Sequence, residues 1–342
     1  MNLLRAFLVL VCFALVHESA LAQPYRGMAV GDVDADDIAD LKNLLAPNIV
    51  RYQIVFFGID ETPIEEVSNI AYLELLDEAS DKLLSLLPSF EANGMKVVID
   101  LHTPPGGFGS GDSLPVYQIY QSASRQSALI TAWEHLATKF KDEESVYAYD
   151  LINEPMVGTS IPSGVKGLNP LFQDLIDAIR EIDSDTKLVV QPPYGDPNRI
   201  DELSLFSDSK IIYSFHTYYP QHFTSQKLGK FKKKRQWPDK QFGKKDLNLN
   251  LAKAFDFSAN NDVEIYVGEF SVVCWAPQNS SARYLKFLIK QFEKRGWHWT
   301  YHIFRESSVH SLEHKCKPKK QTFTGKLSKP GKRIKKFMSK NN

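Results

Sequence analysis

Eight short segments rich in apolar and β-branched residues recur along the chain, and most are followed by a segment long enough to form a helix. Strands that alternate with helices favour a parallel sheet, because each helix carries the chain back to where the next strand begins. Eight such units predict an α/β fold in which the sheet closes into a (β/α)8 TIM barrel. The predicted strands are residues 26–30, 49–56, 96–102, 146–152, 187–191, 211–216, 264–270 and 297–304.

The predicted strands are nearly continuous apolar runs, as Val97-Val98-Ile99 and Ile211-Ile212 illustrate. Such runs are typical of strands whose outer side is covered by helices. With 342 residues, 43% of them hydrophobic, the chain can fill one large core. We therefore expect a single barrel domain over residues 23–314, with two small domains as the alternative.

Charge is distributed unevenly along the chain, although 41 basic residues balance 41 acidic ones. Residues 315–342 contain eleven Lys and Arg and no acidic residue, which leaves the rest with 30 basic and 41 acidic residues, a net charge of −11. This basic tail has no apolar periodicity, so we expect it to be flexible. Residues 227–245 hold nine basic residues and one acidic residue, which favours a solvated loop. Both segments are able to contact anionic polysaccharides or surfaces, whereas no nucleic-acid partner is expected.

The first 22 residues combine a charged start, an apolar middle and the small residues Ala20-Leu21-Ala22. This pattern is typical of a secretory signal peptide cleaved after Ala22, and its apolar run is shorter than the ~18 residues that a membrane span needs. We therefore expect an extracellular protein without a transmembrane segment. Cys12 lies in this segment, and an exported chain that keeps Cys274 and Cys316 favours one disulfide between them over two free thiols.

Polar side chains follow several predicted strands at the point where each strand ends. His102 ends the third strand, Glu154 follows the fourth, His216 ends the sixth and Glu269 lies at the end of the seventh. The carboxyl ends of all strands meet on one face of a barrel, and this face holds the active site in barrel enzymes. We therefore expect these four side chains to lie close together.

Glu154 and Glu269 are the most informative of these residues. A carboxyl group at the mouth of an apolar barrel can act as an acid near neutral pH, and two carboxylates on one rim are the groups that cleave a glycosidic bond. Either glutamate alone is more often a helix cap or part of a salt bridge. Together, in this setting, they favour catalysis.

The motifs around these residues resemble glycoside hydrolase family 5, a family of retaining β-glycanases built on (β/α)8 barrels. The similarity extends over about residues 26–314. The matching motifs are Asn153-Glu154-Pro155 in the fourth strand, Asp100-Leu101-His102 with Pro105-Gly106-Gly107 after the third, His216 and Tyr218 in the sixth, and Gly268-Glu269-Phe270 in the seventh. Each motif is short, and their order along the chain makes the match specific.

This resemblance implies a role for each matching residue. Glu154 would be the general acid and base, and Glu269 the nucleophile. The supporting residues that it implies are Arg51, which keeps the nucleophile ionised; Asn153, which binds the sugar 2-hydroxyl; His102 and His216, which line the glycone subsite; and Tyr218, which hydrogen-bonds the nucleophile. Without this context, either histidine is more often an ordinary core residue.

Aromatic residues near the strand ends are expected to stack on sugar rings. Trp299 and Trp275 are the first candidates, followed by Tyr219 and Phe108, and packing in the core is the alternative for each. Many members of the family carry a tryptophan at the end of the eighth strand, where this chain has His302. The resemblance therefore implies an altered platform for the glycone, which leaves the preferred sugar open.

The predicted activity is that of a secreted retaining glycoside hydrolase, in the first place an endo-β-1,4-glucanase, that cleaves a β-linked polysaccharide or oligosaccharide without a metal or organic cofactor. A β-mannanase, an exo-β-1,3-glucanase or a β-1,6-glycanase on the same scaffold is the alternative, because loops determine the linkage. A non-catalytic carbohydrate-binding barrel belongs to another class. A metal-dependent hydrolase with His102 and His216 as ligands fits poorly, since the sequence has no compact Cys or His cluster.

Overall fold

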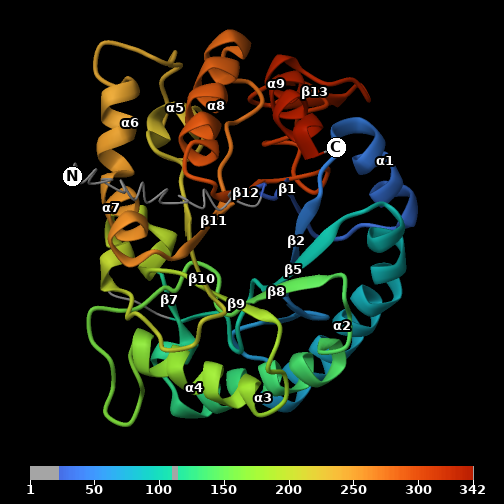
Figure 1. The fold of residues 1–342 in the computed structure, drawn as a ribbon, viewed down its shortest axis with the longest axis vertical. Coiled ribbons are helices and arrows are strands. Elements are labelled where there is room, and N and C mark those ends of the chain that lie inside the picture. Colours follow the sequence, from blue (N-terminus) through green and yellow to red (C-terminus); the bar gives the residue numbers. More distant parts are fainter. Residues whose placement is uncertain (1–22, 110–114, 342) are drawn as a thin grey trace, which may run out of the picture.

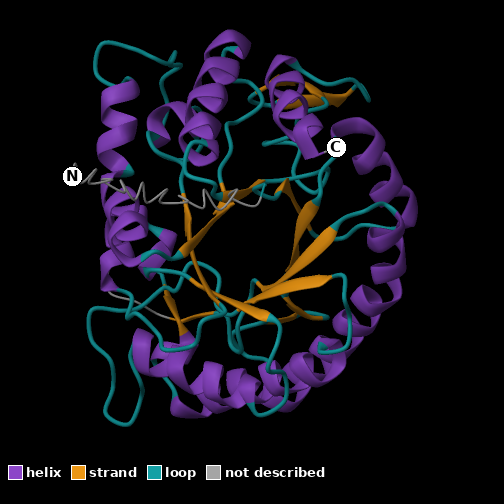
Figure 2. Cartoon of the chain, viewed as in Figure 1, coloured by secondary structure: helices purple, strands orange, loops and turns teal. Residues whose placement is uncertain are grey.

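The computed structural model describes residues 23–109 and 115–341. Eight parallel strands form a closed barrel with helices around its outside (Figure 1, Figure 2). The predicted (β/α)8 fold is therefore confirmed, whereas the predicted signal peptide and Cys12 lie outside the described residues. In hydrogen-bonded order, the strands are β1 (Arg26–Val30), β12 (His298–Tyr301), β11 (Glu264–Glu269), β10 (Ile211–His216), β9 (Lys187–Val190), β8 (Val146–Asp150), β5 (Lys96–Leu101) and β2 (Ile49–Ile54).

The helices form the outer layer that the apolar strands require. In α1, for example, the Asp34 side chain accepts a hydrogen bond at the amino end, and Ile38, Leu41 and Leu45 lie on one buried face. No helix within the described ranges is long and apolar enough to cross a membrane. The helices are α1 (Ala35–Leu45), α2 (Asn69–Ala92), α3 (Ala123–Phe140), α4 (Leu168–Arg180), α5 (Gln221–Thr224), α6 (Lys244–Asn250), α7 (Ala252–Asn261), α8 (Gln278–Glu293) and α9 (Lys329–Met338).

Short irregular elements surround the carboxyl ends of the strands. The link between β9 and β10 holds two 3-10 segments, Pro193–Gly195 and Pro197–Glu202, in place of an α-helix. Two small hairpins follow β2 and β5. They consist of β3 (Gly58–Ile59) with β4 (Thr62–Pro63), and of β6 (Phe108–Gly109) with β7 (Val116–Tyr117).

Several predicted strands are longer than the observed ones at the carboxyl end. The fourth, predicted over residues 146–152, ends at Asp150, and the eighth, predicted over residues 297–304, ends at Tyr301. The residues just beyond, such as Leu151 and Phe304, are apolar and buried although they lie in loops. An apolar run therefore indicates that a segment is buried, but it does not show at which residue the strand ends.

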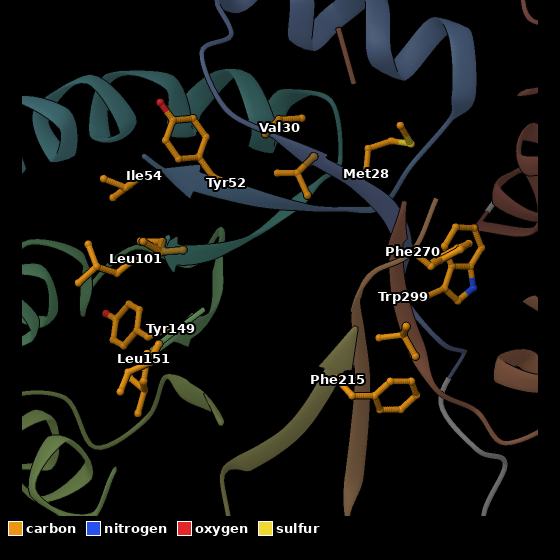
Figure 3. Close-up of a cluster of buried hydrophobic side chains, with 14 of the residues drawn as sticks. Met28, Val30, Tyr52, Ile54, Leu101, Tyr149, Leu151, Phe215, Phe270 and Trp299 are labelled. Carbon is orange, nitrogen blue, oxygen red and sulfur yellow. The ribbon is translucent and has the colours of Figure 1, made fainter. Parts of the chain in front are cut away.

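Apolar side chains form two layers, one inside the barrel and one between strands and helices. Figure 3 shows part of the outer layer, to which Phe215, Phe270 and Trp299 belong. Six strands each contribute one residue to the inner cluster, which consists of Ile49, Val98, Ala148, Val189, Ile212 and Tyr266. Side chains alternate between the two faces of a strand, so the next inward positions lie two residues closer to the carboxyl ends.

The C-terminal segment is folded, and the expectation of a flexible tail is wrong. Strands β13 (His314–Lys317) and β14 (Lys320–Phe323) form a hairpin, and α9 packs against α8. Ile334, Phe337 and Met338 are the buried apolar residues of α9, at the spacing of one helical face. Three apolar residues among many lysines are enough to attach this short helix, because a helix needs to bury only one face.

A disulfide joins Cys274, in the loop after β11, to Cys316 of β13, and their Cα atoms are 5.7 Å apart. This is the pairing that the sequence favoured. The bond ties the hairpin to the barrel across a sequence separation of 42 residues. It therefore limits the freedom of the C-terminal segment in the unfolded chain.

Replacing both cysteines, Cys274→Ser with Cys316→Ser, is expected to lower the free energy of unfolding by about 2–4 kcal/mol, because the loop closed by the bond is long. Urea unfolding of the variant and the wild type measures this difference. Wild-type protein treated with reductant serves as the control, and it should lose the same amount. An unchanged urea midpoint in the variant would show that helix packing alone holds the segment.

Candidate active site

The inward positions of the strands change from apolar to polar toward the carboxyl ends. In β2, Ile49 belongs to the inner cluster, and Arg51 and Gln53 follow at intervals of two residues. In β5 the same interval leads from Val98 to Asp100 and on to His102 just past the strand. Because side chains alternate along each strand, a layer of charged and polar side chains lies directly above the inner apolar cluster, on the side of the carboxyl ends. The other members of this polar layer are Asp150, Gln191, Ser214 and His216.

Glu269, the last residue of β11, lies at the centre of this layer and is 5% exposed. One carboxylate oxygen, Oε1, accepts hydrogen bonds from Arg51 Nη1 at 2.7 Å and from Gln53 Nε2 at 2.8 Å. The other, Oε2, accepts one from the Tyr218 hydroxyl at 2.6 Å. Both oxygens are therefore held in place by donors, which fixes the direction of the carboxylate.

Positive neighbours keep Glu269 ionised. Burial alone would raise the pKa of this carboxyl group, but the charges of His302, His216, Arg51 and His102 together lower it well below its usual range. Burial, followed by the negative charge of Glu269, raises the pKa of Tyr218 well above its usual value, so this hydroxyl stays a donor. The result is an ionised, oriented carboxylate, as a nucleophile requires.

Arg51 is completely buried and links the members of the polar layer. Besides Glu269, its guanidinium contacts Asp150 Oδ2 at 2.8 Å, Asp100 Oδ1 at 3.0 Å and Asn153 Oδ1 at 2.9 Å. A buried guanidinium needs such a set of partners, because its charge has lost its hydration. The three carboxylates around it need the cation in the same way.

Glu154 lies beside His216 in the turn that follows β8. Its Oε1 is 2.8 Å from His216 Nδ1, and its backbone N–H donates to Gln191 Oε1. The backbone φ of Glu154 is +39°, in the left-handed region that side chains rarely adopt. Strain of this kind persists only where surrounding contacts hold it, and it is concentrated at functional sites.

The two glutamates face each other. A carboxylate oxygen of Glu154, a carboxylate oxygen of Glu269 and a ring nitrogen of His216 all lie within 4.8 Å of one another. Two cavities meet at Glu154. Cavity A, of about 530 Å³, is lined among others by Gln53, His102, Asn153, Tyr117 and Phe57. Cavity B, of about 760 Å³, is lined among others by His216, Tyr218, Tyr219, Phe231 and Phe242.

His102 and Asp150 are each held by a neighbour in the polar layer, His102 by Asp100 and Asp150 by Gln191. His102 Nδ1 is 2.7 Å from Asp100 Oδ2, and although burial opposes the charge, Asp100 raises the pKa of this histidine. Burial raises the pKa of Asp150 to about 6, against the effect of Arg51, and both Asp150 oxygens accept from the Gln191 amide. The contact with Asp100 orients the His102 ring, which lines cavity A.

His302, just past the end of β12, lies next to Glu269. Its Nδ1 is 3.5 Å from Glu269 Oε2, and its ring centroid is 5.6 Å from that of His310. Burial lowers the pKa of His302, and burial followed by repulsion from His302 lowers the pKa of His310 to about 4. His310 Nδ1 is also 2.8 Å from Ser271 Oγ. The His310 ring is therefore mainly neutral at pH 7.

The low pKa of His310 predicts a loss of stability in acid. Below about pH 6.5 the unfolded chain binds a proton here, whereas the native state does not until about pH 4, so stability falls as the pH falls through this window. Between pH 7 and pH 5, wild-type protein should lose about 2 kcal/mol more than the variant His310→Gln. Urea unfolding at the two pH values measures this, and equal losses would contradict it.

The structure brings most of the predicted site residues together and separates two of them. Trp299 is fully buried, its ring packs against Phe270, and its Nε1 donates to Glu293 of α8. Its side chain points outward from β12, so it cannot stack on a sugar in the cleft, and that expectation is wrong. Trp275 lines neither cavity and instead donates to the Gln226 carbonyl oxygen at 2.7 Å.

Other aromatic residues line the cleft. Phe108 and Tyr219, the second pair of candidates, border cavity A and cavity B respectively. Phe57, which was not predicted from the sequence, is 85% exposed at the rim of cavity A. Gln53, Asp150 and Gln191 were not predicted either, although the interval of two residues from Arg51 to Gln53 was a usable signal.

A metal site with His102 and His216 as ligands is the alternative that fitted the sequence poorly. In the described part of the chain, the group whose ligand atoms converge is Glu154, His216 and Glu269, and His102 is not among them. Hydrogen bonds from Arg51, Gln53 and Tyr218 already engage both oxygens of Glu269. The site therefore consists of the facing carboxylates of Glu154 and Glu269, with hydrogen-bond donors around Glu269.

Two known proteins are similar to this chain in sequence. Endoglucanase C of Acetivibrio thermocellus is 24% identical over 238 residues, which cover 60% of this chain and 67% of that protein. A probable glucan 1,3-beta-glucosidase A of Aspergillus fumigatus is 32% identical over 148 residues, 41% of this chain and 32% of that protein.

Solved structures show the same fold. A mutant form of Thermotoga maritima Cel5A in complex with cellobiose has a TM-score of 0.69 at 18% identity, over 92% of this chain and 96% of that chain. The cellulose synthase subunit Z of Clostridioides difficile has a TM-score of 0.68 at 19% identity, over 91% and 99%. The family model for cellulase, glycosyl hydrolase family 5, matches residues 23–306. The chain therefore belongs to glycosyl hydrolase family 5, a family of O-glycosyl hydrolases.

Proposed function

We propose that this protein is a secreted retaining endoglucanase that cleaves β-1,4-linked glucan through a covalent glycosyl-enzyme intermediate. The observation that carries the proposal is the approach of the Glu154 and Glu269 carboxylate oxygens to within 4.8 Å. Retaining enzymes keep their two carboxyl groups about 5–5.5 Å apart, whereas inverting enzymes leave about 6.5–9.5 Å for a water molecule. The short separation favours direct attack by one carboxylate.

The surroundings of each carboxylate assign the two roles. Glu269 is ionised and oriented by three donors, so it attacks the anomeric carbon. Glu154, beside His216 and open to both cavities, protonates the leaving oxygen and then deprotonates the water that releases the sugar. Asn153 and His102 border cavity A only, so cavity A holds the glycone and cavity B the leaving group.

Space on both sides of the reacting bond supports endo action. Cavity A and cavity B both adjoin Glu154, so a chain can extend in both directions from the bond that is cleaved. Phe57 and Phe108 offer apolar ring faces in cavity A, and Tyr219 and Phe242 offer them in cavity B. Aromatic faces of this kind bind the C–H face of pyranose rings.

Exo-acting cleavage of β-1,3-glucan is the second candidate. It is supported by the 32% identity to a probable glucan 1,3-beta-glucosidase over 148 residues. A β-mannanase and a β-1,6-glycanase use the same two carboxylates, so the chemistry of the site does not separate them from a glucanase.

A substrate panel tests the proposal. Soluble cellulose derivatives, mannan, laminarin and pustulan are compared, with and without EDTA, and proton NMR follows the anomer that is released first. The proposal expects the highest kcat/KM on β-1,4-glucan, mixed internal products and a β anomer as the first product. A first product with the α configuration would overturn the retaining mechanism, and glucose released singly from laminarin would favour exo action.

A further inference from the structure

A loop rich in lysine borders the leaving-group side of the cleft. It is defined here as the basic loop, residues 227–245, which follows α5 and includes the first two residues of α6, in the upper left part of Figure 1. Phe231 and Phe242 of this loop line cavity B together with Glu154 and His216. The loop is therefore part of the wall of the active-site cleft and not a remote excursion of the surface.

The basic loop is held firmly in this position. The Gln226 side chain accepts from the Arg235 N–H at 2.9 Å and donates to the carbonyl oxygens of Phe223 and Arg235. Trp237 is buried, and its ring packs against Tyr284 of α8. These contacts fix both ends of the lysine-rich stretch, so its charge stays beside cavity B.

The positive charge of the loop has no matching negative charge around it. All eight of its lysines are exposed, and within residues 23–109 and 115–341 none of them forms an ion pair. The one ion pair of the loop joins Arg235 to Asp239, at 3.9 Å. The eight lysines are Lys227, Lys230, Lys232, Lys233, Lys234, Lys240, Lys244 and Lys245. Like charges concentrated in one loop repel one another, and an anionic chain that binds across them relieves the repulsion.

The field of the loop extends to cavity B. The Lys230 ammonium lies 5.6 Å from the centroid of the Phe231 ring, which faces the cavity. Burial, and then the charge of Arg235, lower the pKa of His222, another residue of the cavity wall. Among the described residues that line cavity B, the only carboxylate besides Glu154 is Asp196, whose Oδ1 accepts two hydrogen bonds from Asn198. The leaving-group side of the cleft is thus a positive environment.

We infer that the leaving-group side of the cleft binds a β-linked glycan that carries anionic groups, carboxylate or sulfate, and that the basic loop supplies the charges that recognise them. This inference rests on the proposed function, because it places the anionic residues downstream of the cleaved bond. It makes the loop a determinant of substrate specificity. The interaction is electrostatic, so it should weaken as salt rises.

The test compares anionic with neutral polymers, and it compares two variants that lose the same number of lysines from different parts of the surface. The loop variant combines Lys230→Gln, Lys232→Gln, Lys233→Gln and Lys234→Gln. The control removes the same charge from the β13–β14 hairpin, through Lys315→Gln, Lys317→Gln, Lys319→Gln and Lys320→Gln, where the lysines are exposed and line neither cavity A nor cavity B. The substrates are carboxymethyl-cellulose, cellulose sulfate and neutral hydroxyethyl-cellulose, at about 20 mM and about 300 mM NaCl.

The expected result is a change in preference. In low salt, the loop variant should lower the ratio of kcat/KM on an anionic polymer to that on hydroxyethyl-cellulose by about fivefold or more, and the hairpin control should leave it within about twofold. High salt should lower the ratio for wild-type protein in the same direction. Carboxymethyl-cellulose and cellulose sulfate separate the two kinds of anionic group. An unchanged ratio in the loop variant, or equal losses in both variants, would overturn the inference.

Binding measurements keep this inference separate from the catalytic proposal. Calorimetric titration of the same polymers into proteins carrying Glu269→Gln reports affinity without hydrolysis. If the protein with an intact Glu269 cleaves none of the polymers, but the loop variant still loses affinity for the anionic ones, the proposed reaction fails and the charge recognition stands. If the loop variant loses affinity for a DNA fragment and not for carboxymethyl-cellulose, the loop serves a nucleic acid and the inference is refuted.

Discussion

Replacing Glu269 with glutamine is expected to lower kcat by about 10⁴-fold or more, while the protein stays folded. Glutamine keeps the size of the side chain and can still contact Arg51, Gln53 and Tyr218, but its amide cannot form the glycosyl-enzyme bond. Hydrolysis of a soluble β-1,4-glucan and of an activated aryl glycoside measures the loss. The free energy of unfolding of the variant should stay close to that of the wild type.

A matched control lies on the same strand. Glu264, at the opposite end of β11, pairs with Lys187 and accepts a hydrogen bond from Tyr147. Glu264→Gln is the same chemical change far from the cleft, and it should leave kcat per folded molecule nearly unchanged.

Rescue by a small nucleophile separates the two carboxylates. In Glu269→Ala, azide added to the reaction should occupy the space of the lost carboxylate and give a glycosyl azide of inverted configuration. In Glu154→Ala, azide should give the retained configuration, because Glu269 still forms the intermediate. The same configuration from both variants would contradict the assignment of roles.

Replacing Arg51 with methionine is expected to have the second largest effect. The variant Arg51→Met leaves Asp100, Asp150 and Glu269 buried without their cation, which should cost about 3–5 kcal/mol of stability. Loss of the guanidinium also raises the pKa of Glu269, so the acid limb of the kcat/KM profile should move to higher pH. Urea unfolding and the pH profile of the folded fraction measure the two effects.

Arg26 provides the control for Arg51. It is also buried, and it pairs with Glu293 at 2.6 Å on the opposite side of the barrel from the cleft. Arg26→Met removes a buried cation in the same way, so it should lower stability but leave the acid limb of the pH profile in place. If both variants shift the profile alike, Arg51 acts through general stability and not through Glu269.

The barrel could be predicted from the sequence because each of its units has a local signal. Buried parallel strands are apolar in nearly every residue, and the segments between them carry the periodicity of helices. The carboxyl ends of the strands share one face in any such barrel, so Glu154 and Glu269 could be placed together before their contacts were known. The strand ends themselves were less clear, because Leu151 and Ile152 are buried loop residues that resemble strand residues.

The wrong predictions, for Trp299 and for the C-terminal segment, concern features that depend on contacts with residues far away in the sequence. Trp299 and His302 are three residues apart, yet Trp299 packs under α8 and His302 lies 3.5 Å from Glu269. The C-terminal segment looked too charged to fold, but α8 offers a surface for Ile334, Phe337 and Met338, and a disulfide holds the hairpin. In both cases, the surface against which the segment packs determines whether its side chains are buried or face the cleft.

By itself, the sequence of this protein determined the barrel, the family and the two glutamates, because these depend on periodicity and on short motifs at strand ends. Only the tertiary structure decided which donors hold Glu269, which aromatic rings face the cleft and that the basic loop forms the wall of cavity B. The physical reason is that hydrogen bonds and charge pairs act over a few ångströms. Residues such as Arg51 and Glu269, 218 positions apart, come within that range only when the barrel closes.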